Sequence, residues 1–445
     1  MDISGIYQIF KSCHYQLTTD SRKIIPGGVF LALKGEKFNG NAYAVQALDS
    51  GAAFVILDEA EWIPPQADER FLLVPNALQA LQQLAQFHRR QFSIPVIAVC
   101  GSNGKTTTKE LIGAVLSTQF QVLSTEGNFN NHIGVPLTLL RLRENHTCAV
   151  IEMGANHLEE IADLCEIAQP THGLITSIGK DHLEGYGSVE NVARSNEELF
   201  EYLRKIAGTA WINCDDPFVN EMSTNGINKI EYGRNQLFTG KINSIRLTGM
   251  DISLYSPGSN SEMKVTTHLA GRHNLQNIVG AWTIGHSFDI SPEKIAQAIA
   301  NYLPANNRSQ VIEKFGRQVL LDAYNANPSS VEAGLDFFYS VSGNQKAVIL
   351  GDMFELGEFA ESEHKRILEM ALEQNEIKLI ACGKYFHQAG GILAHRNLRT
   401  FESFETLEKS KAEMIEFLKD RNQIFIKGSR GMAMERILAW MDGSG

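Results

Sequence analysis

Paired cysteines are missing from this sequence. The chain has 6 cysteines in 445 residues, all widely spaced, and contains no C-x-x-C pair. Isolated cysteines of this kind are usually small buried side chains in a reducing compartment, whereas disulfide frameworks and zinc sites need recognisable spacings. We therefore expect free thiols rather than disulfides or a cysteine-bound metal.

Long apolar runs are also missing. No run approaches the roughly 20 residues that a membrane-spanning helix requires. The N-terminal segment MDISGIYQIF lacks a basic stretch followed by an apolar core, so it does not read as a secretory signal. Hydrophobic residues at 43% and charged residues at 20% are typical of a globular protein. We expect a soluble protein in the cytoplasm.

An excess of basic residues is the third absence. Lys and Arg number 40 against 51 for Asp and Glu, which gives a formal net charge of -11. This balance argues against a nucleic-acid partner, because nucleic-acid phosphates need a basic face, but it allows a local anion pocket. The length of the chain exceeds what one hydrophobic core usually serves, so two or three domains are expected.

The pattern of strands and helices predicts three α/β domains. The first, residues 1–84, is small, with strand-like segments at Gly27–Leu33 and Ala52–Asp58 and helical spacing that begins at Asn76. The second, residues 85–305, alternates short apolar runs with helical segments, which is typical of a parallel sheet. Within it, Lys241–His268 alternates with period two and predicts an antiparallel appendage.

The third domain, residues 306–445, restarts the strand–helix alternation. Its strand-like segments are QVLLDAY, KAVILGD, IKLIACG and NQIFIKG, and helical segments separate them. This order predicts a second, Rossmann-like doubly wound sheet of ordinary domain size.

The stretch AVCGSNGKTTTKE, residues 98–110, predicts a phosphate-binding loop. A buried strand precedes Gly101 and Gly104, and a helix follows, so backbone N–H groups converge on an anion at the helix N-terminus. Lys105 would reach the terminal phosphates and the Thr106 hydroxyl a Mg²⁺ ion. The usual spacing would place a further glycine at Val99, and its absence shortens the loop. The alternative is a glycine-rich turn capped by Thr106.

Polar residues follow the neighbouring strands of the second domain. Glu152 ends one apolar run, and Asp181 and His182 come just after the next. If these strands flank the loop strand, all three side chains lie at its carboxyl edge, where ligands bind in such sheets. Each residue alone is as readily structural, but together they predict metal ligation and charge stabilisation.

The third domain shows the same bias at its strand ends. Asp322, Asp352, Lys427 and Arg430 each follow an apolar run. Singly they could be helix caps or solvated loop charges. Jointly they predict a second polar site, and two such sites suggest a reaction between two bound molecules.

The sequence resembles the Mur ligases over essentially its whole length. The matching segments are TTDSRKIIPGGVFLALKGEKFNGNAYA (18–44), GSNGKTT (101–107), EGNFNNHIGVPL (126–137), IEMGANH (151–157), DHLEGYGS (181–188), GRHNLQN (271–277), DAYNANPSS (322–330), GDMFELG (351–357) and KGSRGMAME (427–435). DAYNANP and KGSRGMAME are the most discriminating, and they look like those of the members that add D-alanyl-D-alanine to UDP-N-acetylmuramoyl-tripeptide.

The resemblance implies ATP and Mg²⁺ as cofactors and amide-bond formation through an acyl phosphate. It implies a UDP-sugar domain, a central ATP domain and a C-terminal domain that contacts ATP and the dipeptide, in a monomeric enzyme of peptidoglycan synthesis. The implied ATP-binding residues are Gly101, Ser102, Asn103, Gly104, Lys105, Thr106, Thr107, Asn274, Arg308, Asp322 and Asn325. The implied substrate residues are Ser21, Arg22, Asn128, Asn130, Asn131, Asp352, Lys427, Ser429 and Arg430. Thr106, Glu152 and His182 would hold the metal, and Lys105, Glu152, His182 and Asn196 would serve catalysis.

Two positions depart from the family pattern. Family members usually carry a lysine, modified to a carbamate that supports a second Mg²⁺, in the helix after DHLEGYGS. Asn196 stands there in this chain, and an amide cannot form a carbamate. Arg308 also lacks the glycine that generally precedes it in the family. The arrangement of a second metal is therefore open, with Asn196 binding the ion directly or through water.

Two other functions compete with this interpretation. The first is a related amide ligase such as folylpolyglutamate synthetase, which shares the fold and the ATP chemistry but lacks the N-terminal uridine-binding module. The second is a nucleotide-binding protein without ligase activity, suggested by Asn196. Lys105, Glu152, His182, Asn274 and Asp322 argue against this second alternative.

Overall fold

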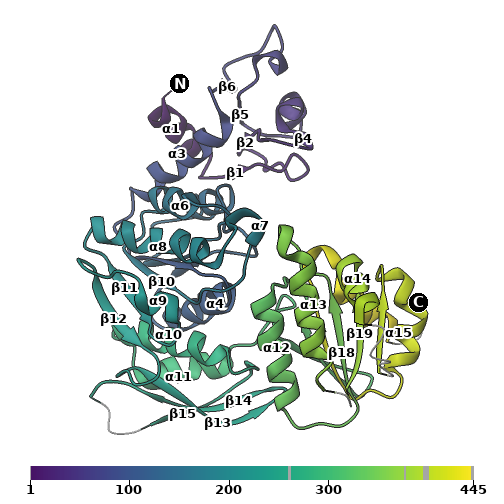
Figure 1. The fold of residues 1–445 in the computed structure, drawn as a ribbon. Helices are drawn as coiled ribbons and strands as arrows, with labels where there is room; N and C mark the ends of the chain where they lie inside the picture. The colour runs from purple at the N-terminus through teal and green to yellow at the C-terminus, as the bar shows by residue number, and fades with distance from the viewer. Residues whose placement is uncertain (1, 259–261, 375–376, 394–399, 442–445) are drawn as a thin grey trace.

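The computed structural model describes residues 2–258, 262–374, 377–393 and 400–441. It contains three α/β domains (Figure 1), in agreement with the prediction from the sequence. The N-terminal domain lies at one end of the central domain, and the C-terminal domain packs beside the central domain. All 6 cysteines are free thiols, and Cys214 alone among them is not fully buried. Every helix of the described segments is too short or too polar to span a membrane.

The N-terminal domain is built on a parallel sheet of order β1-β2-β5-β6. Its strands are β1 (Leu17–Thr18), β2 (Val29–Leu31), β5 (Phe54–Leu57) and β6 (Phe71–Leu73), with a small antiparallel pair β3 (Lys34–Gly35) and β4 (Phe38–Asn39). Its helices are α1 (Ile3–Ser12), α2 (Ala44–Asp49) and α3 (Ala77–Arg89), with 3-10 turns η1 (Gly40–Tyr43) and η2 (Ala60–Trp62). Helix α3 packs on α5 (Gly134–Leu139) and α6 (Glu160–Ala168) of the central domain, so the predicted boundary at residue 84 falls inside a helix that connects the two domains.

His88, near the end of α3, joins these two domains. Its ring is fully buried and lies edge-on against Phe10 and Phe92. Its Nδ1 accepts from the Tyr7 hydroxyl of α1 at 3.2 Å, and its Nε2 donates to the Leu142 carbonyl oxygen at 3.0 Å. Burial lowers the pKa of His88 to about 4. The ring is therefore neutral at pH 7, in the tautomer that these two partners select.

Lowering the pH from 7 to 5 is expected to destabilise the wild-type protein by about 2 kcal/mol more than a His88→Gln variant. The unfolded histidine binds a proton near pH 6.5, whereas the folded one does so only near pH 4. The stabilisation by neutral His88 is thus complete above pH 6.5 and is lost as the pH falls toward 4. Urea denaturation at the two pH values measures the difference. The exposed His268, changed to Gln, is the matched control, and an equal pH dependence of His88→Gln and wild type would contradict the assignment.

The central domain contains a fully parallel sheet of order β12-β11-β10-β7-β9-β8. Its strands are β7 (Val96–Cys100), β8 (Val122–Ser124), β9 (Cys148–Glu152), β10 (His172–Ile175), β11 (Thr209–Asn213) and β12 (Asn228–Tyr232). Its helices are α4 (Lys105–Leu116), α5 (Gly134–Leu139), α6 (Glu160–Ala168), α7 (Leu183–Tyr186), α8 (Val189–Lys205) and α9 (Pro217–Glu221). The loop strand β7 has β9 on one side and β10 on the other, which confirms the expectation that these strands flank it.

An antiparallel appendage completes this domain, as the period-two alternation predicts. It has the order β13-β14-β15, with strands β13 (Thr239–Arg246), β14 (Gly249–Tyr255) and β15 (Met263–Thr267). Two helices follow, α10 (Asn274–Ser287) and α11 (Pro292–Asn301), and both pack on α4. This packing fixes the helix that begins at the phosphate loop.

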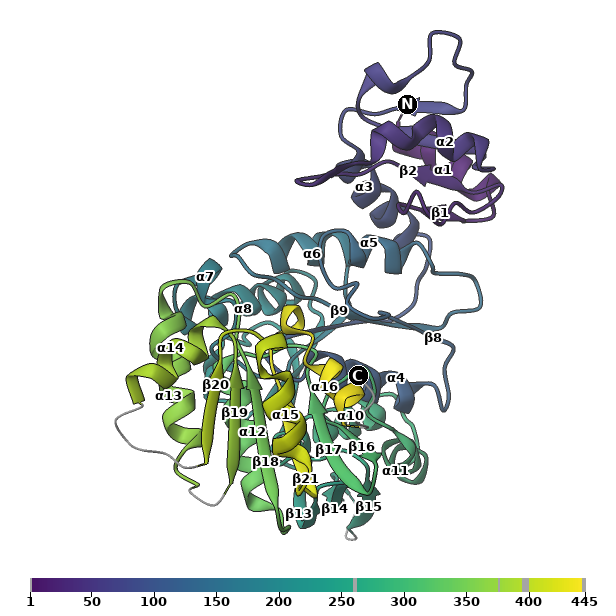
Figure 2. The same ribbon diagram turned by 90° about the vertical axis from the view of Figure 1, so that its right-hand side faces the viewer.

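The C-terminal domain has a six-stranded sheet of order β16-β17-β21-β18-β19-β20, in which only the edge strand β16 is antiparallel. Its strands are β16 (Gln310–Lys314), β17 (Arg317–Asp322), β18 (Lys346–Gly351), β19 (Lys378–Cys382), β20 (Phe401–Phe404) and β21 (Gln423–Lys427). Helices cover both faces (Figure 2): α12 (Pro328–Ser340), α13 (Ala360–Ala371), α14 (Lys384–Leu393), α15 (Lys411–Leu418) and α16 (Ile437–Trp440), with turns η3 (Gly357–Phe359), η5 (Glu408–Ser410), η6 (Arg430–Met432) and η7 (Met434–Arg436).

The two strands at the edges of this sheet, β16 and β20, are absent from the sequence-based prediction. Both contain charged residues, and neither has a fully buried residue. An edge strand with water on one side lacks the continuous apolar run that makes β17, β18, β19 and β21 recognisable. Two of the inner strands, β17 and β21, end at Asp322 and Lys427, which line the cavity described below.

Candidate functional site

The phosphate loop occupies the turn between β7 and α4, as predicted. Gly101 has φ +127° and Gly104 has φ +80°, both in the region that favours glycine. A Cβ on Gly101 would lie 2.2 Å from the Thr176 hydroxyl oxygen, and one on Gly104 would lie 2.6 Å from Asn277 Oδ1. The Thr176 hydroxyl, just after β10, also donates to the Asn103 carbonyl oxygen at 2.6 Å. The loop is therefore closely packed on its neighbours despite the missing glycine at Val99.

Lys105 lies folded over this loop. Its Nζ donates to the carbonyl oxygens of Gly101 at 2.5 Å and Ser102 at 3.3 Å, and it is 3.9 Å from Asp181 Oδ2. The side chain is largely buried. A cation is thus held at the end of the loop amides, where a phosphate chain would lie.

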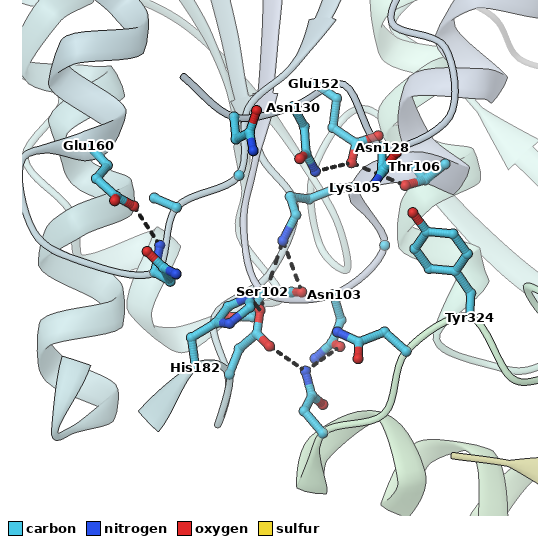
Figure 3. A pocket seen from close by; sticks show the side chains of 18 of the residues that line it. Ser102, Asn103, Lys105, Thr106, Asn128, Asn130, Glu152, Glu160, His182 and Tyr324 are labelled. Atoms are coloured by element: carbon cyan, nitrogen blue, oxygen red, sulfur yellow. Dashed lines mark hydrogen bonds and ion pairs between the residues drawn. The ribbon is translucent and has the colours of Figure 1, made fainter. Parts of the chain in front are cut away.

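Glu152, at the end of β9, forms the next part of the site (Figure 3). Its Oε1 accepts from the Thr106 hydroxyl at 3.1 Å and from Asn130 Nδ2 at 2.9 Å. Its other oxygen, Oε2, is buried and has no hydrogen-bond partner in the described part of the chain. A buried carboxylate oxygen without a partner, beside a hydroxyl and an amide, is an oxygen donor set of the kind that Mg²⁺ prefers.

His182 faces the C-terminal domain. Its Nδ1 lies 2.6 Å from Glu355 Oε2, and its Nε2 lies 3.7 Å from Asp181 Oδ2. Burial opposes protonation of the ring, but the carboxylates of Glu355 and Asp181 outweigh it, so the pKa of His182 is raised. Across the described ranges, no three His, Cys, Asp or Glu residues are grouped to hold a metal ion. His182 as a metal ligand therefore stays a prediction, and so do Thr106 and Glu152, whose side chains are hydrogen-bonded to each other.

A cavity of about 1110 Å³ connects these groups to the C-terminal domain. It reaches from the phosphate loop to the α3–α6 face near the N-terminal domain. The predicted residues that line it are Ser102, Asn103, Gly104, Lys105, Thr106, Thr107, Asn128, Asn130, Asn131, Glu152, His182, Asn274, Arg308, Asp322, Asn325 and Lys427. Most of the site predicted from the sequence is thus gathered around one space. Gly101 comes directly after β7, at the base of the loop.

The C-terminal wall of the cavity pairs Asp322 with Lys427. Asp322 Oδ2 lies 2.6 Å from Lys427 Nζ, and its Oδ1 accepts from the Ser309 backbone N–H at 3.1 Å. Burial would raise the pKa of Asp322, but the adjacent ammonium lowers it overall. The Arg308 guanidinium stacks 3.7 Å above the Tyr324 ring, so a cation and an aromatic face lie side by side here.

Several predicted residues do not line this cavity. Arg22 is exposed and pairs with Asp20, and its neighbour Ser21 also lies in the N-terminal domain. Asn196 is buried in α8, where its Nδ2 donates to the Val192 carbonyl oxygen at 2.8 Å. Their predicted roles stay predictions, and Asn196 is engaged within its own helix.

The three remaining residues belong to the loops that follow β18 and β21. Asp352 accepts from the backbone N–H groups of Tyr385 and Phe386, both at 3.0 Å, near the start of α14. Ser429 is buried and accepts from the Phe354 N–H, whereas Arg430 is exposed and pairs with Glu435. In this arrangement Asp352 and Ser429 support the backbone.

The cavity also has lining residues that the sequence prediction did not assign. They include Tyr324, Asn327, Ser329, His273, Asn277, Glu160 and four glutamines of α3, namely Gln79, Gln82, Gln83 and Gln86. Tyr324, Asn327 and Ser329 fall within DAYNANPSS, so that segment carried a signal for them. The glutamines carried none, because a polar helix face is indistinguishable in sequence from a solvated one.

The fold and the site define a phosphate-loop, nucleotide-binding enzyme in which a second doubly wound domain completes the cavity. Three family models cover the chain: "Mur ligase family, catalytic domain" over residues 14–89, "Mur ligase middle domain" over 99–285 and "Mur ligase, glutamate ligase domain" over 307–430. This chain belongs to the Mur ligase family and is an ATP-dependent ligase.

Two curated relatives that match nearly the whole chain carry the same name. The chain is 34% identical to the UDP-N-acetylmuramoyl-tripeptide–D-alanyl-D-alanine ligase of Bacillus subtilis (strain 168), over 95% of this chain and 92% of that protein. It is 33% identical to the enzyme of the same name from Escherichia coli (strain K12), over 96% and 94%. A crystal structure of MurF from Acinetobacter baumannii superposes with a TM-score of 0.87 at 30% identity, over 95% of this chain and 92% of that one.

Proposed function

We propose that this chain joins D-alanyl-D-alanine to UDP-N-acetylmuramoyl-tripeptide, with ATP as the energy source, to give the UDP-muramoyl-pentapeptide precursor of peptidoglycan. The observation that carries the proposal is the single cavity lined by Lys105 and Glu152 on one side and by Asp322 and Lys427 on the other. The relatives named for this reaction match nearly the whole chain, including its N-terminal domain. Such a cavity can hold a nucleotide and a second substrate together.

The chemistry of amide-bond formation explains why the cavity must hold ATP and the peptide carboxylate together. A carboxylate is a poor acyl donor, because its leaving group would be oxide. Transfer of the γ-phosphoryl group to the peptide carboxylate releases ADP and gives an acyl phosphate. The amine of the dipeptide then attacks the acyl carbon, loses a proton and displaces inorganic phosphate. Lys105 lies at the phosphate loop, where it would offset the charge of the two anionic reactants.

The cavity suggests how the substrates are arranged. The nucleotide would lie between the loop and the C-terminal wall, near Asn274, Arg308, Asp322 and Asn325. The peptide would extend past Asn128, Asn130 and Asn131 toward the N-terminal domain, where Ser21 and Arg22 would meet the uridine end. Lys427, Ser429 and Arg430 would serve the dipeptide site, supported by Asp352.

Mg²⁺ fits the donor set beside the loop. Thr106 and Glu152 would hold it, with His182 as the further predicted ligand, and the ion would neutralise charge on the phosphates when bound. Asn130 orients Glu152 through its hydrogen bond to Oε1. That bond fixes the orientation of the carboxylate.

Activity is expected to be independent of added bicarbonate. The carbamate that the family pattern implies requires a lysine amine, and Asn196 instead uses its amide to bond the Val192 carbonyl oxygen. Turnover is measured in carbon-dioxide-free buffer with and without bicarbonate. A rise on adding bicarbonate would show that a different lysine carries the carbamate.

The decisive experiment compares two substrate sets. The purified protein is incubated with ATP and either UDP-muramoyl-tripeptide plus D-alanyl-D-alanine or folate plus glutamate, and product is detected by mass spectrometry. We expect the pentapeptide product only. Turnover of folate alone would support the folylpolyglutamate synthetase alternative.

A second measurement tests the non-ligase alternative. Phosphate release is expected to require both UDP-muramoyl-tripeptide and D-alanyl-D-alanine. ATP binding without such release would favour a nucleotide-binding protein that lacks ligase activity.

We further propose that the enzyme acts as a monomer in the cytoplasm, with no nucleic-acid or membrane partner.

A further inference from the structure

The C-terminal domain contacts a short segment of the central domain at several points. This coupling loop, residues 179–184, follows β10 and carries both Asp181 and His182 of the site. The Ser329 hydroxyl accepts from the Lys180 N–H at 3.1 Å, and the Glu184 N–H donates to the Glu355 carbonyl oxygen at 3.0 Å. A Cβ on Gly179 would lie 2.8 Å from the Ser329 oxygen, so the fit depends on glycine there.

Apolar and charged contacts add to these hydrogen bonds between the coupling loop and the C-terminal domain. Leu183 is buried and packs within the hydrophobic core of the C-terminal domain. Lys180 forms an ion pair with the buried carboxylate of Glu363 on α13, which also pairs with Arg366 at 2.9 Å. The coupling loop is thus held at its backbone, at an apolar side chain and at a charge.

Asn327 makes the contact closest to the phosphate loop. It is the N-cap of α12, and its Oδ1 accepts from the Ser330 N–H at 2.8 Å. That bond leaves Nδ2 pointing out of the helix, where it donates to Asn103 Oδ1 at 3.0 Å and Asp181 Oδ1 at 3.1 Å. One amide group therefore caps a helix with its oxygen and bridges two domains with its nitrogen.

Asp181 connects Asn327 to Lys105, the residue proposed to act on the phosphates. Asp181 faces Asn327 with one oxygen and Lys105 with the other, the latter at 3.9 Å. Figure 3 shows Asn103, Lys105 and His182 gathered at this point. Asp181 thus lies between Asn327 of the C-terminal domain and the lysine of the phosphate loop.

We propose that Asn327 is a positioning residue: on docking of the C-terminal domain, its Nδ2 fixes Asp181 and Asn103, and so sets Lys105 for phosphoryl transfer. This inference rests on the proposed function for its kinetic test. A residue of the C-terminal domain would thus orient the phosphate loop of the central domain for catalysis.

Asn327→Asp and Asn327→Ser separate this role from helix capping. Asp and Ser are N-caps about as good as Asn, so both keep the bond to the Ser330 N–H. Ser loses the bridging nitrogen, and Asp replaces it with an oxygen that repels Asp181. We expect kcat to fall about tenfold in the Ser variant and further in the Asp variant, with KM for ATP within about twofold and the melting temperature within about 2 °C of wild type.

The matched control is Asn76→Asp, the same change at the N-cap of α3. Asn76 is exposed and caps the Gln79 N–H within its own helix, so this variant is expected to keep wild-type kcat. A wild-type kcat in Asn327→Asp, or an equal loss in both Asp variants, would overturn the proposal. So would a loss that appears only in KM.

Small-angle X-ray scattering with ADP gives a readout that needs no turnover. Asn327→Asp is expected to be more extended than wild type, because repulsion from Asp181 opposes docking. Identical scattering curves would contradict the proposal. If wild type forms no pentapeptide product, the proposed function fails, while the scattering result still decides whether Asn327 couples the domains.

Discussion

Replacing Lys105 with alanine is expected to reduce the rate of product formation by at least about 1000-fold. The ammonium group is held over the loop by the carbonyl oxygens of Gly101 and Ser102. In this position it would stabilise the charge that spreads over the γ-phosphoryl oxygens in the transition state. Alanine removes that charge and offers no group that could replace it.

Phosphate release and product formation, measured at saturating ATP, test this expectation. Because the loss concerns the transition state, kcat is expected to fall far more than the affinity for ADP. Lys294→Ala, an exposed lysine of α11 in the same domain, is the matched control and is expected to keep full activity. A loss of less than about tenfold in Lys105→Ala would contradict the assignment of the phosphate loop.

Changing Glu152 to glutamine is expected to lower turnover by at least about 100-fold and to raise the Mg²⁺ concentration needed for half-maximal rate. Glutamine has nearly the same shape, and its oxygen can still accept from the Thr106 hydroxyl and Asn130. The change removes the negative charge at Oε2, the buried oxygen that has no hydrogen-bond partner among the residues that the structure describes. The fold should therefore survive while the proposed metal ligand is lost.

A magnesium titration of the steady-state rate measures both effects. Glu144→Gln, an exposed carboxylate after α5, controls for a general loss of negative charge. Unchanged magnesium dependence in Glu152→Gln would show that the carboxylate serves Thr106 and Asn130 structurally. Circular dichroism of the variant verifies that it is folded.

Local patterns in the sequence predict the central part of the site. The apolar run before Gly101, the glycines and the helical spacing after Lys105 all describe one strand–turn–helix unit. The apolar character of successive strands further predicts a parallel sheet, and in such sheets the ends of neighbouring strands share one edge. Glu152 ends one such strand and Asp181 comes after another, so the sequence predicts both beside the loop on the condition that these strands flank β7, which the structure confirms.

The polar strand ends of the C-terminal domain show where this reasoning fails. Asp322 and Lys427 face the cavity, as predicted, because β17 and β21 are neighbours in the sheet. Asp352 follows the next strand, β18, yet its carboxylate accepts from two backbone N–H groups near the start of α14. Position at a strand end gives the edge but not the direction of the side chain, which depends on the nearest unpaired donors.

The amino-acid sequence alone specifies the three α/β domains, the phosphate loop and the polar edge beside it. These features depend on backbone conformation and apolar periodicity, which act between residues close in the chain. Two sets of contacts follow only from the folded arrangement. Asn327 donates to Asp181 and Asn103, and Asn196 donates to the Val192 carbonyl oxygen of its own helix. Such contacts depend on how separate domains dock and on which donor lies within hydrogen-bond distance, and a linear pattern specifies neither.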